Sequence, residues 1–326
     1  MRSTSIPPLA AALLALLLTA VSGVARAQAW PTKPVRIVTA FGAGSASDIV
    51  ARMLAEELQV AFKQSFIVDN KPGASGMLAA EAVSKSAPDG YTLFLSTNTA
   101  HSVNPHTFKK LPYEPLTGFT PIARICYFPF VLAVNSKLPV QTVGELVAYS
   151  RSAQNKATYA YGNSTGQIAG AAFASLTKLD VAAVPYKSTP QALTDLVGGQ
   201  VSFMFVDLAS SQPHNKAGRL RLLAISSEQR SPLAPDVPTL ASAANLPGFD
   251  LSAWVGVLGP AGLPADITAR LSEQLLQVLA KKEIIERLQG LGADVAPAPA
   301  PVFEVYLREQ LQSWGRKVRD AGITPE

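Results

Sequence analysis

Two segments of the chain share one layout: a short apolar run, a turn of small residues, and then a helical pattern. The first covers Val35 to Met53, with the small residues Gly42 to Ser47 between the β-branched run and the helix. The second begins with Thr158 to Tyr161 and turns at Gly162 to Gly166. Strands that alternate with helices in this way are typical of α/β proteins, in which helices cover both faces of a parallel sheet. The sequence therefore predicts the α/β fold class.

The rest of the chain continues this alternation of strands and helices. Between the two segments and beyond them, the apolar runs predict strands at 66–69, 91–96, 131–134, 182–186, 201–206, 220–225 and 254–258. Helices are expected to begin at Asp48 and at the capping box Thr142 to Glu145, and further helices are expected at 77–85, 167–178, 190–197, 264–279 and 301–319. Residues Asn104 to Pro121 carry several prolines and aromatics and read as an irregular connection.

The N-terminus has the pattern of a secretory signal peptide. Arg2 precedes the apolar run Leu9 to Val21, and either Ala25-Arg26-Ala27 or Ala27-Gln28-Ala29 fits a cleavage site. Cleavage at the first would remove residues 1–27. A membrane anchor is disfavoured, because a spanning helix needs about 20 apolar residues. Cys126 is the single cysteine, which excludes an internal disulfide. We therefore expect export to the periplasm.

The charge of the chain disfavours a nucleic-acid partner. The composition is 48% hydrophobic and 16% charged, as in ordinary globular proteins. Loss of Arg2 and Arg26 with the signal peptide would lower the formal net charge from +5 to +3, and the basic residues are scattered. His101 and His106 are isolated and accompany no carboxylate cluster, so no metal site is predicted. One of them is expected in a loop and the other in packing. No cofactor is expected either.

The two small-residue turns predict a carboxylate site. The first turn of a helix carries unpaired N–H groups and the positive end of the helix dipole, which attract anions. Neither turn contains an arginine, so the backbone N–H groups at 45–47 and 164–166 are the expected donors. The candidate ligand-binding residues are Phe41, Gly44, Ser45, Ala46, Ser47, Asp48, Thr97, Asn98, Ser164, Thr165, Gly166, Tyr186 and Asp207.

The first turn also resembles a nucleotide-binding loop. Gly42 to Ser47 nearly matches the dinucleotide-binding pattern G-x-G-x-x-G, with Asp69 ending the next strand. Ser47 replaces the third glycine, and exported proteins rarely meet NAD, so this interpretation is disfavoured. Trp254, Tyr161 and Tyr186 are either core aromatics or walls of a pocket.

A serine hydrolase is the main alternative. Residues 162–166 match G-x-S-x-G, the nucleophile elbow, which would make Ser164 the nucleophile. Such an enzyme needs a downstream histidine, and only His214 lies downstream, in a polar segment expected on a helix surface. The possible acids are Asp180, Asp195 and Asp207. Asp207 ends a buried strand, where it could instead cap a helix or bind a ligand amine.

Several motifs make the mature chain resemble the Bug receptors, the extracytoplasmic solute-binding proteins of tripartite tricarboxylate transporters. The motifs are Trp30-Pro31-Thr32-Lys33-Pro34, Ser47-Asp48-Ile49-Val50-Ala51-Arg52, Val68-Asp69-Asn70-Lys71-Pro72-Gly73-Ala74, Ala87-Pro88-Asp89-Gly90-Tyr91-Thr92-Leu93, Leu111-Pro112-Tyr113, Val184-Pro185-Tyr186-Lys187, Gly198-Gly199-Gln200-Val201, Pro235-Asp236-Val237-Pro238-Thr239 and Gly259-Pro260-Ala261-Gly262. The chain departs from the family at Gly42 and Ala43, where two prolines are usual, and at Gly44 to Ala46, where a glycine-rich run is usual.

The resemblance implies a two-lobed, type II-like periplasmic-binding-protein clamshell. Lobe one would comprise 30–129 plus 254–326, and lobe two 130–253. A monomer of this kind captures a small carboxylate in its cleft without catalysis and delivers it to membrane permease subunits. A receptor that signals to a sensor kinase stays an alternative. The solute is left open among a dicarboxylate, a tricarboxylate, an acidic amino acid and an aromatic acid.

Overall fold

The computed structural model describes residues 30–325 except 153, 228–229, 248 and 250. The predicted signal peptide lies outside these residues. The strands are β1 (Val35–Thr39), β2 (Phe66–Asn70), β3 (Thr92–Thr97), β4 (Phe119–Asn135), β5 (Thr158–Tyr161), β6 (Ala182–Pro185), β7 (Phe203–Asp207), β8 (Leu220–Ile225), β9 (Ser252–Pro260) and β10 (Asp294–Pro299). The helices are α2 (Ala46–Phe62), α3 (Met77–Ser84), α4 (Asn104–Thr107), α5 (Val143–Arg151), α6 (Ser164–Thr177), α7 (Thr189–Val197), α8 (Leu208–Lys216), α9 (Leu240–Ala244), α10 (Ala265–Leu279), α11 (Lys282–Gly290) and α12 (Ala300–Asp320).

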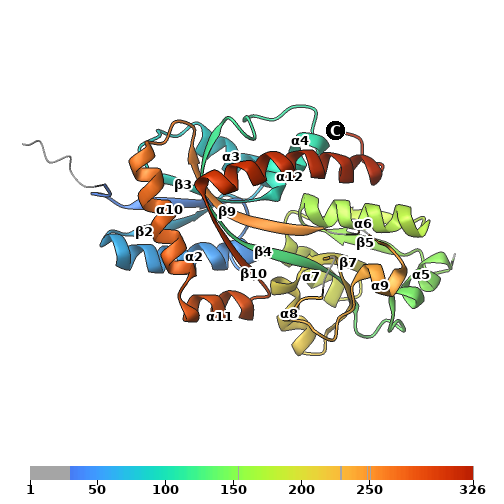
Figure 1. Ribbon diagram of the computed structural model, residues 1–326. Helices are drawn as coiled ribbons and strands as arrows, with labels where there is room; N and C mark the ends of the chain where they lie inside the picture. Colours follow the sequence, from blue (N-terminus) through green and yellow to red (C-terminus); the bar gives the residue numbers. More distant parts are fainter. Residues whose placement is uncertain (1–29, 153, 228–229, 248, 250, 326) are drawn as a thin grey trace, which may run out of the picture.

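The long strand β4 joins two groups of strands (Figure 1). Its first part, Phe119 to Pro129, pairs with β9, and the following residues, Phe130 to Val134, pair with β7. The strand order is β2-β1-β3-β9-β4 on one side and β4-β7-β5-β6 on the other, while β8 and β10 also pair with β4. β4 therefore changes pairing partner between Pro129 and Phe130, and β9 brings the chain back to the first group of strands.

The α/β prediction is confirmed, and the sheets are mixed. Parallel pairs join β1 to β2 and β3, and β5 to β6 and β7. Antiparallel pairs join β4 to its neighbours β7, β8, β9 and β10, and β3 to β9. The parallel strands are connected through helices, whereas the crossing strands run out and back between the two groups, which makes them antiparallel.

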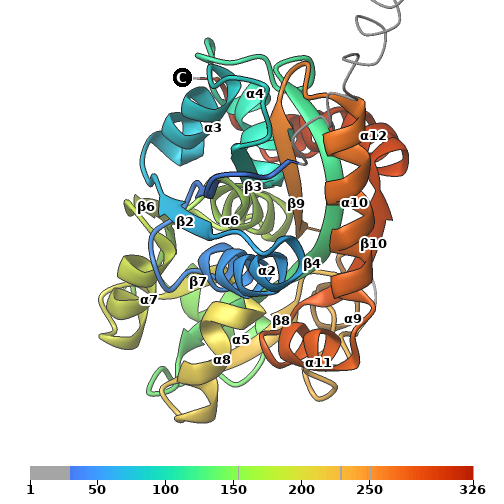
Figure 2. The same cartoon turned by 90° about the vertical axis from the view of Figure 1, so that its left-hand side faces the viewer.

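Helices cover both faces of the β1–β3 sheet (Figure 2). Leu93 and Leu95 belong to the same buried cluster as residues of α2 and α10, whereas Phe94 packs with residues of α3 and α12. Trp254 is fully buried, with its ring centroid 5.4 Å from that of Phe303. Trp254 is therefore a core aromatic and no pocket wall. No helix among the described residues has the length and apolarity that a membrane span requires.

Four elements differ from the sequence-based expectation. β4 begins at Phe119, although Pro121 and Pro129 favour a break; Pro121 lies at a register shift of the β4–β9 pair, where a proline is tolerated. Residues 104–107 form the short helix α4 inside the segment predicted as irregular. The helix α11 and strand β10 were not predicted. β10 contains prolines at 297 and 299, which are typical of edge strands.

Candidate functional site

The loop before α2 leaves two backbone donors free. Ser45 is the N-cap, and its hydroxyl oxygen accepts a hydrogen bond from the N–H of Asp48 at 3.3 Å. The N–H of Ser45 itself donates to the carbonyl of Gly42 at 3.2 Å. Ala46 and Ser47 are the first two helical residues, whose N–H groups have no acceptor within a helix. No described residue accepts from them either, so they remain available to an anion.

Asp48 holds this loop in place. Its carboxylate accepts hydrogen bonds from the Gly44 N–H at 3.0 Å, the Asn70 amide at 2.9 Å and Arg52 Nε at 3.1 Å. Asn70 also donates to the carbonyl of Phe41 at 2.9 Å. Burial alone would raise the pKa of Asp48, but the bonds from Arg52, Gly44 and Asn70 outweigh it and lower the pKa below its ordinary value.

The prediction that Asp48 contacts the ligand is therefore corrected. Its side chain is 3% exposed and lines neither of the cavities described below. Gly44 lines neither cavity; it has φ +83°, a left-handed conformation that favours glycine. Asp48 and Gly44 therefore fix the shape of the loop, and they affect a ligand only by positioning the backbone of this loop.

The N-terminus of α6 repeats the arrangement. Asn163 is the N-cap, and its Oδ1 accepts from the Gly166 N–H at 2.8 Å. This bond corrects the expectation for Gly166, because its N–H is already used. Ser164 and Thr165 occupy the first two helical positions, as Ala46 and Ser47 do in α2, and no described residue accepts from their N–H groups.

Two hydrogen bonds tie α6 to the segment that follows β3. The Asn98 amide donates to the Thr165 hydroxyl at 2.7 Å, and the Ser164 hydroxyl donates to Asn104 Oδ1 at 3.3 Å. Ser164 is 2% exposed and lines neither cavity. The hydrogen-bond partner of the Ser164 hydroxyl is the amide oxygen of Asn104, and among the described residues no histidine bonds to this hydroxyl. The hydrolase alternative therefore lacks its triad.

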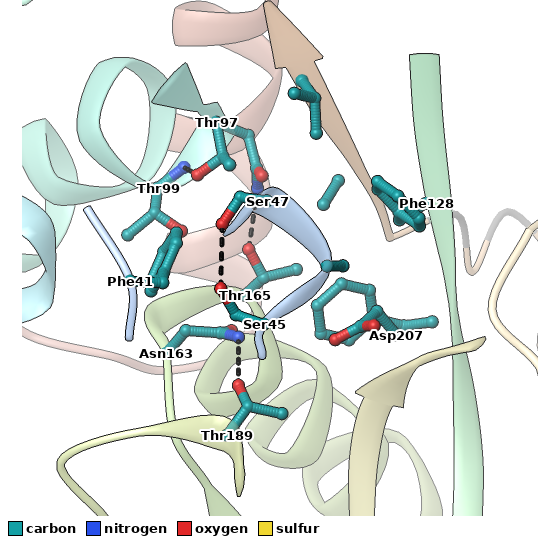
Figure 3. A pocket seen from close by; sticks show the side chains of 15 residues that line it. Phe41, Ser45, Ser47, Thr97, Thr99, Phe128, Asn163, Thr165, Thr189 and Asp207 are labelled. Atoms are coloured by element: carbon teal, nitrogen blue, oxygen red, sulfur yellow. Dashed lines mark hydrogen bonds between the residues drawn. The ribbon is translucent and has the colours of Figure 1, made fainter. Parts of the chain in front are cut away.

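An inner cavity of about 50 Å³ lies where the two helix N-termini meet (Figure 3). Several residues predicted from the sequence line it: Phe41, Ser45, Ala46, Ser47, Thr97, Asn98, Thr165 and Asp207. The sequence analysis did not assign to the site the other lining residues: Thr99, Phe128, Phe130, Asn163, Thr189, Ala253 and Val255. Of these, only Asn163 carried a local signal, since an asparagine directly before a helix is a typical N-cap.

The inner cavity has two unlike sides. Ser47, Thr97 and Thr99 lie on one side, and Phe128 and Asp207 lie on the other (Figure 3). Asp207 is 7% exposed and is the N-cap of α8, where it accepts from the Ser210 N–H at 2.8 Å. Burial raises the pKa of its carboxyl above the ordinary value. The capping role considered for Asp207 is therefore confirmed, and its position in the cavity wall leaves a ligand contact open.

A larger outer cavity of about 420 Å³ adjoins the inner one. Phe41, Ser45, Asn163 and Thr189 line both. The outer walls are residues 72–76 and 186–190, together with Ala40, Gly42, Tyr161 and Gly162. The Tyr186 hydroxyl donates to Asp195 at 2.7 Å, and this bond raises the pKa of Tyr186 to about 12. Tyr186 thus belongs to the outer wall.

The histidines have structural surroundings. His101 is fully buried, with Nδ1 2.6 Å from the carbonyl oxygen of Pro115, and burial lowers its pKa to about 4. His106 Nε2 contacts the carbonyl of Leu311 at 2.7 Å. His101 is therefore buried in the core, and the partly exposed His106 packs against α12. Both lie in helical segments, so the expectation of a loop histidine is wrong. Among the described residues, no group of three His, Cys, Asp or Glu side chains could hold a metal.

Comparison with known proteins decides the family. Residues 50–323 match the tripartite tricarboxylate transporter family receptor. The chain belongs to this family. A UPF0065 protein of Bordetella bronchiseptica is 36% identical over 314 residues, which cover 96% of this chain and 93% of that protein. The family consists of solute-binding receptors and not of enzymes.

Two solved structures have the same fold. A protein of R. palustris, solved with adipate, is 32% identical with a TM-score of 0.88 and covers 91% of this chain and all of its own, 100%. The periplasmic binding protein BugD is 28% identical with a TM-score of 0.85, again covering 91% of this chain and 100% of its own. The predicted resemblance to Bug receptors and the periplasmic-binding-protein fold are confirmed.

Proposed function

We propose that this receptor captures a small carboxylate solute in the periplasm and delivers it to a tripartite tricarboxylate-type permease. The observation that carries the proposal is the meeting of two helix N-termini at one cavity. The N–H groups of Ala46 and Ser47 come from one side and that of Thr165 comes from the other, whereas Ser164 lines neither cavity. The adipate bound to the R. palustris relative supports a carboxylate ligand.

These N–H donors can supply much of the free energy of binding. Ala46, Ser47 and Thr165 line the inner cavity. Three hydrogen bonds to a charged group contribute about 5–9 kcal/mol before the costs of association. Each helix N-terminus adds about 0.3–1 kcal/mol, and more when buried. Micromolar binding requires about 8 kcal/mol net, so contacts to the rest of the solute must supply part of it.

The two groups of strands would act as lobes, comprising 30–129 plus 254–326 and 130–253. The partner change of β4 at Pro129 and Phe130 supports a hinge there. The bonds from Asn98 to Thr165 and from Ser164 to Asn104 join residues of the two lobes, as expected of a closed form. Release of these bonds would open the cleft by hinge motion.

Binding of a carboxylate is expected to close the lobes and shrink the molecule. Small-angle scattering should give a smaller radius of gyration with saturating ligand than without, while calorimetry confirms binding. Adipate is the first compound to test, with a panel of other small carboxylates beside it. An unchanged radius in the presence of proven binding would contradict the hinge. Failure of every carboxylate to bind would contradict the proposed function.

The mature protein is expected to begin near Gln28 or Trp30 and to be recovered in the periplasmic fraction. The reason is the short apolar run that ends in small residues at 25–27. N-terminal sequencing of the exported protein checks this expectation. A protein that retains Met1, or that is recovered only with membranes, would contradict it.

A further inference from the structure

Asp207 is a buried carboxyl on the wall of the inner cavity that has no cationic partner. It is 7% exposed, and no ion pair among the described residues includes it. One oxygen accepts the capping N–H of Ser210, and the Ser210 side chain and the N–H of Asp207 itself also act on the carboxyl as donors. These donors are all neutral, and because buried charges are normally paired, a ligand cation would supply the missing opposite charge.

The cavity wall around Asp207 disfavours a second negative charge on the solute. Phe128, Phe130, Ala253 and Val255 supply apolar surface. No lysine, arginine or histidine belongs to the lining, all of which the structure describes. A second carboxylate of the solute would therefore leave water, meet no positive side chain and lie near an acid of the same sign.

The opposite side of the cavity has the reverse character. The first-turn N–H groups of Ala46, Ser47 and Thr165 and the hydroxyls of Ser47 and Thr97 are suited to one carboxylate. Figure 3 shows Ser47 and Thr97 on the side away from Asp207. The small volume of about 50 Å³, enough for only a few water molecules, favours a short solute in the inner cavity.

From this arrangement we propose that the solute is a small zwitterion with a single carboxylate, held by the N-termini of α2 and α6, and an ammonium group that binds Asp207. The inference rests on the proposed function and names its substrate class. The ammonium would supply the positive charge that the cavity lining lacks. Asp207 would then distinguish amino acids of this kind from dicarboxylates.

The proposal is tested with compounds that differ only at one end. Butanoate, 4-aminobutanoate and succinate share four carbons and one carboxylate, and the three- and five-carbon series extend the test to other lengths. Calorimetry on the wild-type receptor, freed of ligand by unfolding and refolding, is expected to show at least tenfold tighter binding of the amino compound than of either partner in one of the series. The variant Asp207→Asn should remove this preference, while asparagine still caps α8.

A matched variant separates the site from general charge effects. Asp180→Asn makes the same change at an exposed position that lines neither cavity, and it should keep the wild-type preference. Tighter binding of the dicarboxylates, equal binding of all three compound types, or an unchanged preference in Asp207→Asn would each overturn the zwitterion proposal. The proposed function would survive these results, since it fails only when no carboxylate of any kind binds.

Discussion

The substitution Ser47→Asp is expected to weaken binding of the carboxylate solute about a thousandfold. Ser47 is 4% exposed, lines the inner cavity and has a first-turn N–H that no described residue accepts from. An aspartate there would place a negative charge where the carboxylate of the solute must lie. Two like charges about 4 Å apart repel by about 4 kcal/mol at an effective dielectric constant of 20, and each 1.4 kcal/mol is tenfold in affinity.

The variant should nevertheless fold. An acidic residue in the first turn of a helix is favourable, because it complements the positive end of the helix dipole. Ser47→Asn is the matched control, since it has nearly the same size without the charge; it should lose about tenfold. Calorimetry, with circular dichroism to check folding, measures both. Equal affinities of the aspartate and asparagine variants would show that the carboxylate is not held at α2.

The same charge can be placed on the other helix by Thr165→Asp. Thr165 is 1% exposed and accepts a hydrogen bond from Asn98, which an aspartate oxygen can also accept. Gly44→Asp would be a poorer experiment, because Gly44 has φ +83° and any side chain there strains the backbone. A loss of affinity in Gly44→Asp could therefore result from a distorted loop as well as from repulsion of the ligand.

The part of the site that could be predicted from the sequence is the part built by local signals. A strand, a turn of small residues and a helix each have a short-range pattern, so both helix N-termini were found. The pattern does not reveal which N–H groups the chain itself uses. Asn163 accepts from the Gly166 N–H, and the Gly42 carbonyl accepts from the Ser45 N–H, so two of the expected donors are engaged inside the protein.

The apolar wall could not be predicted because it is formed by pairing between distant strands. Phe128 and Phe130 lie on β4, and Ala253 and Val255 lie on β9. Along the chain these residues look like ordinary core positions, and the pairing of Phe128 with Ala253 is what brings them together. Asp207 was found because an acid at the end of a buried strand is unusual. That Asp207 lies in the same cavity wall as Phe128 and Phe130 could be seen only in the folded structure.

The substitution Asp48→Ala is expected to lower the free energy of unfolding by about 2–4 kcal/mol at neutral pH. The Asp48 carboxylate is 3% exposed and accepts bonds from Gly44, Asn70 and Arg52. A hydrogen bond to a charged group contributes about 1.5–3 kcal/mol, and the loss of this acceptor leaves the Gly44 N–H unpaired. The Arg52 side chain is half exposed, so its share is small. Ligand affinity should fall as well, because the loop before α2 loses its anchor.

The pH dependence of stability distinguishes this buried carboxylate from a surface ion pair. The folded-state pKa of Asp48 is lowered, so its contribution is fully present above the unfolded value near 3.8 and is lost as the pH falls through the folded pKa. The difference between wild type and Asp48→Ala should therefore shrink as the pH falls below about 4. Asp69→Ala, which removes an acid paired with Arg36 and Lys71 at the surface, should cost under about 1 kcal/mol. Urea unfolding at several pH values measures all three proteins; equal losses for Asp48→Ala and Asp69→Ala would mean that Asp48 does not hold the loop.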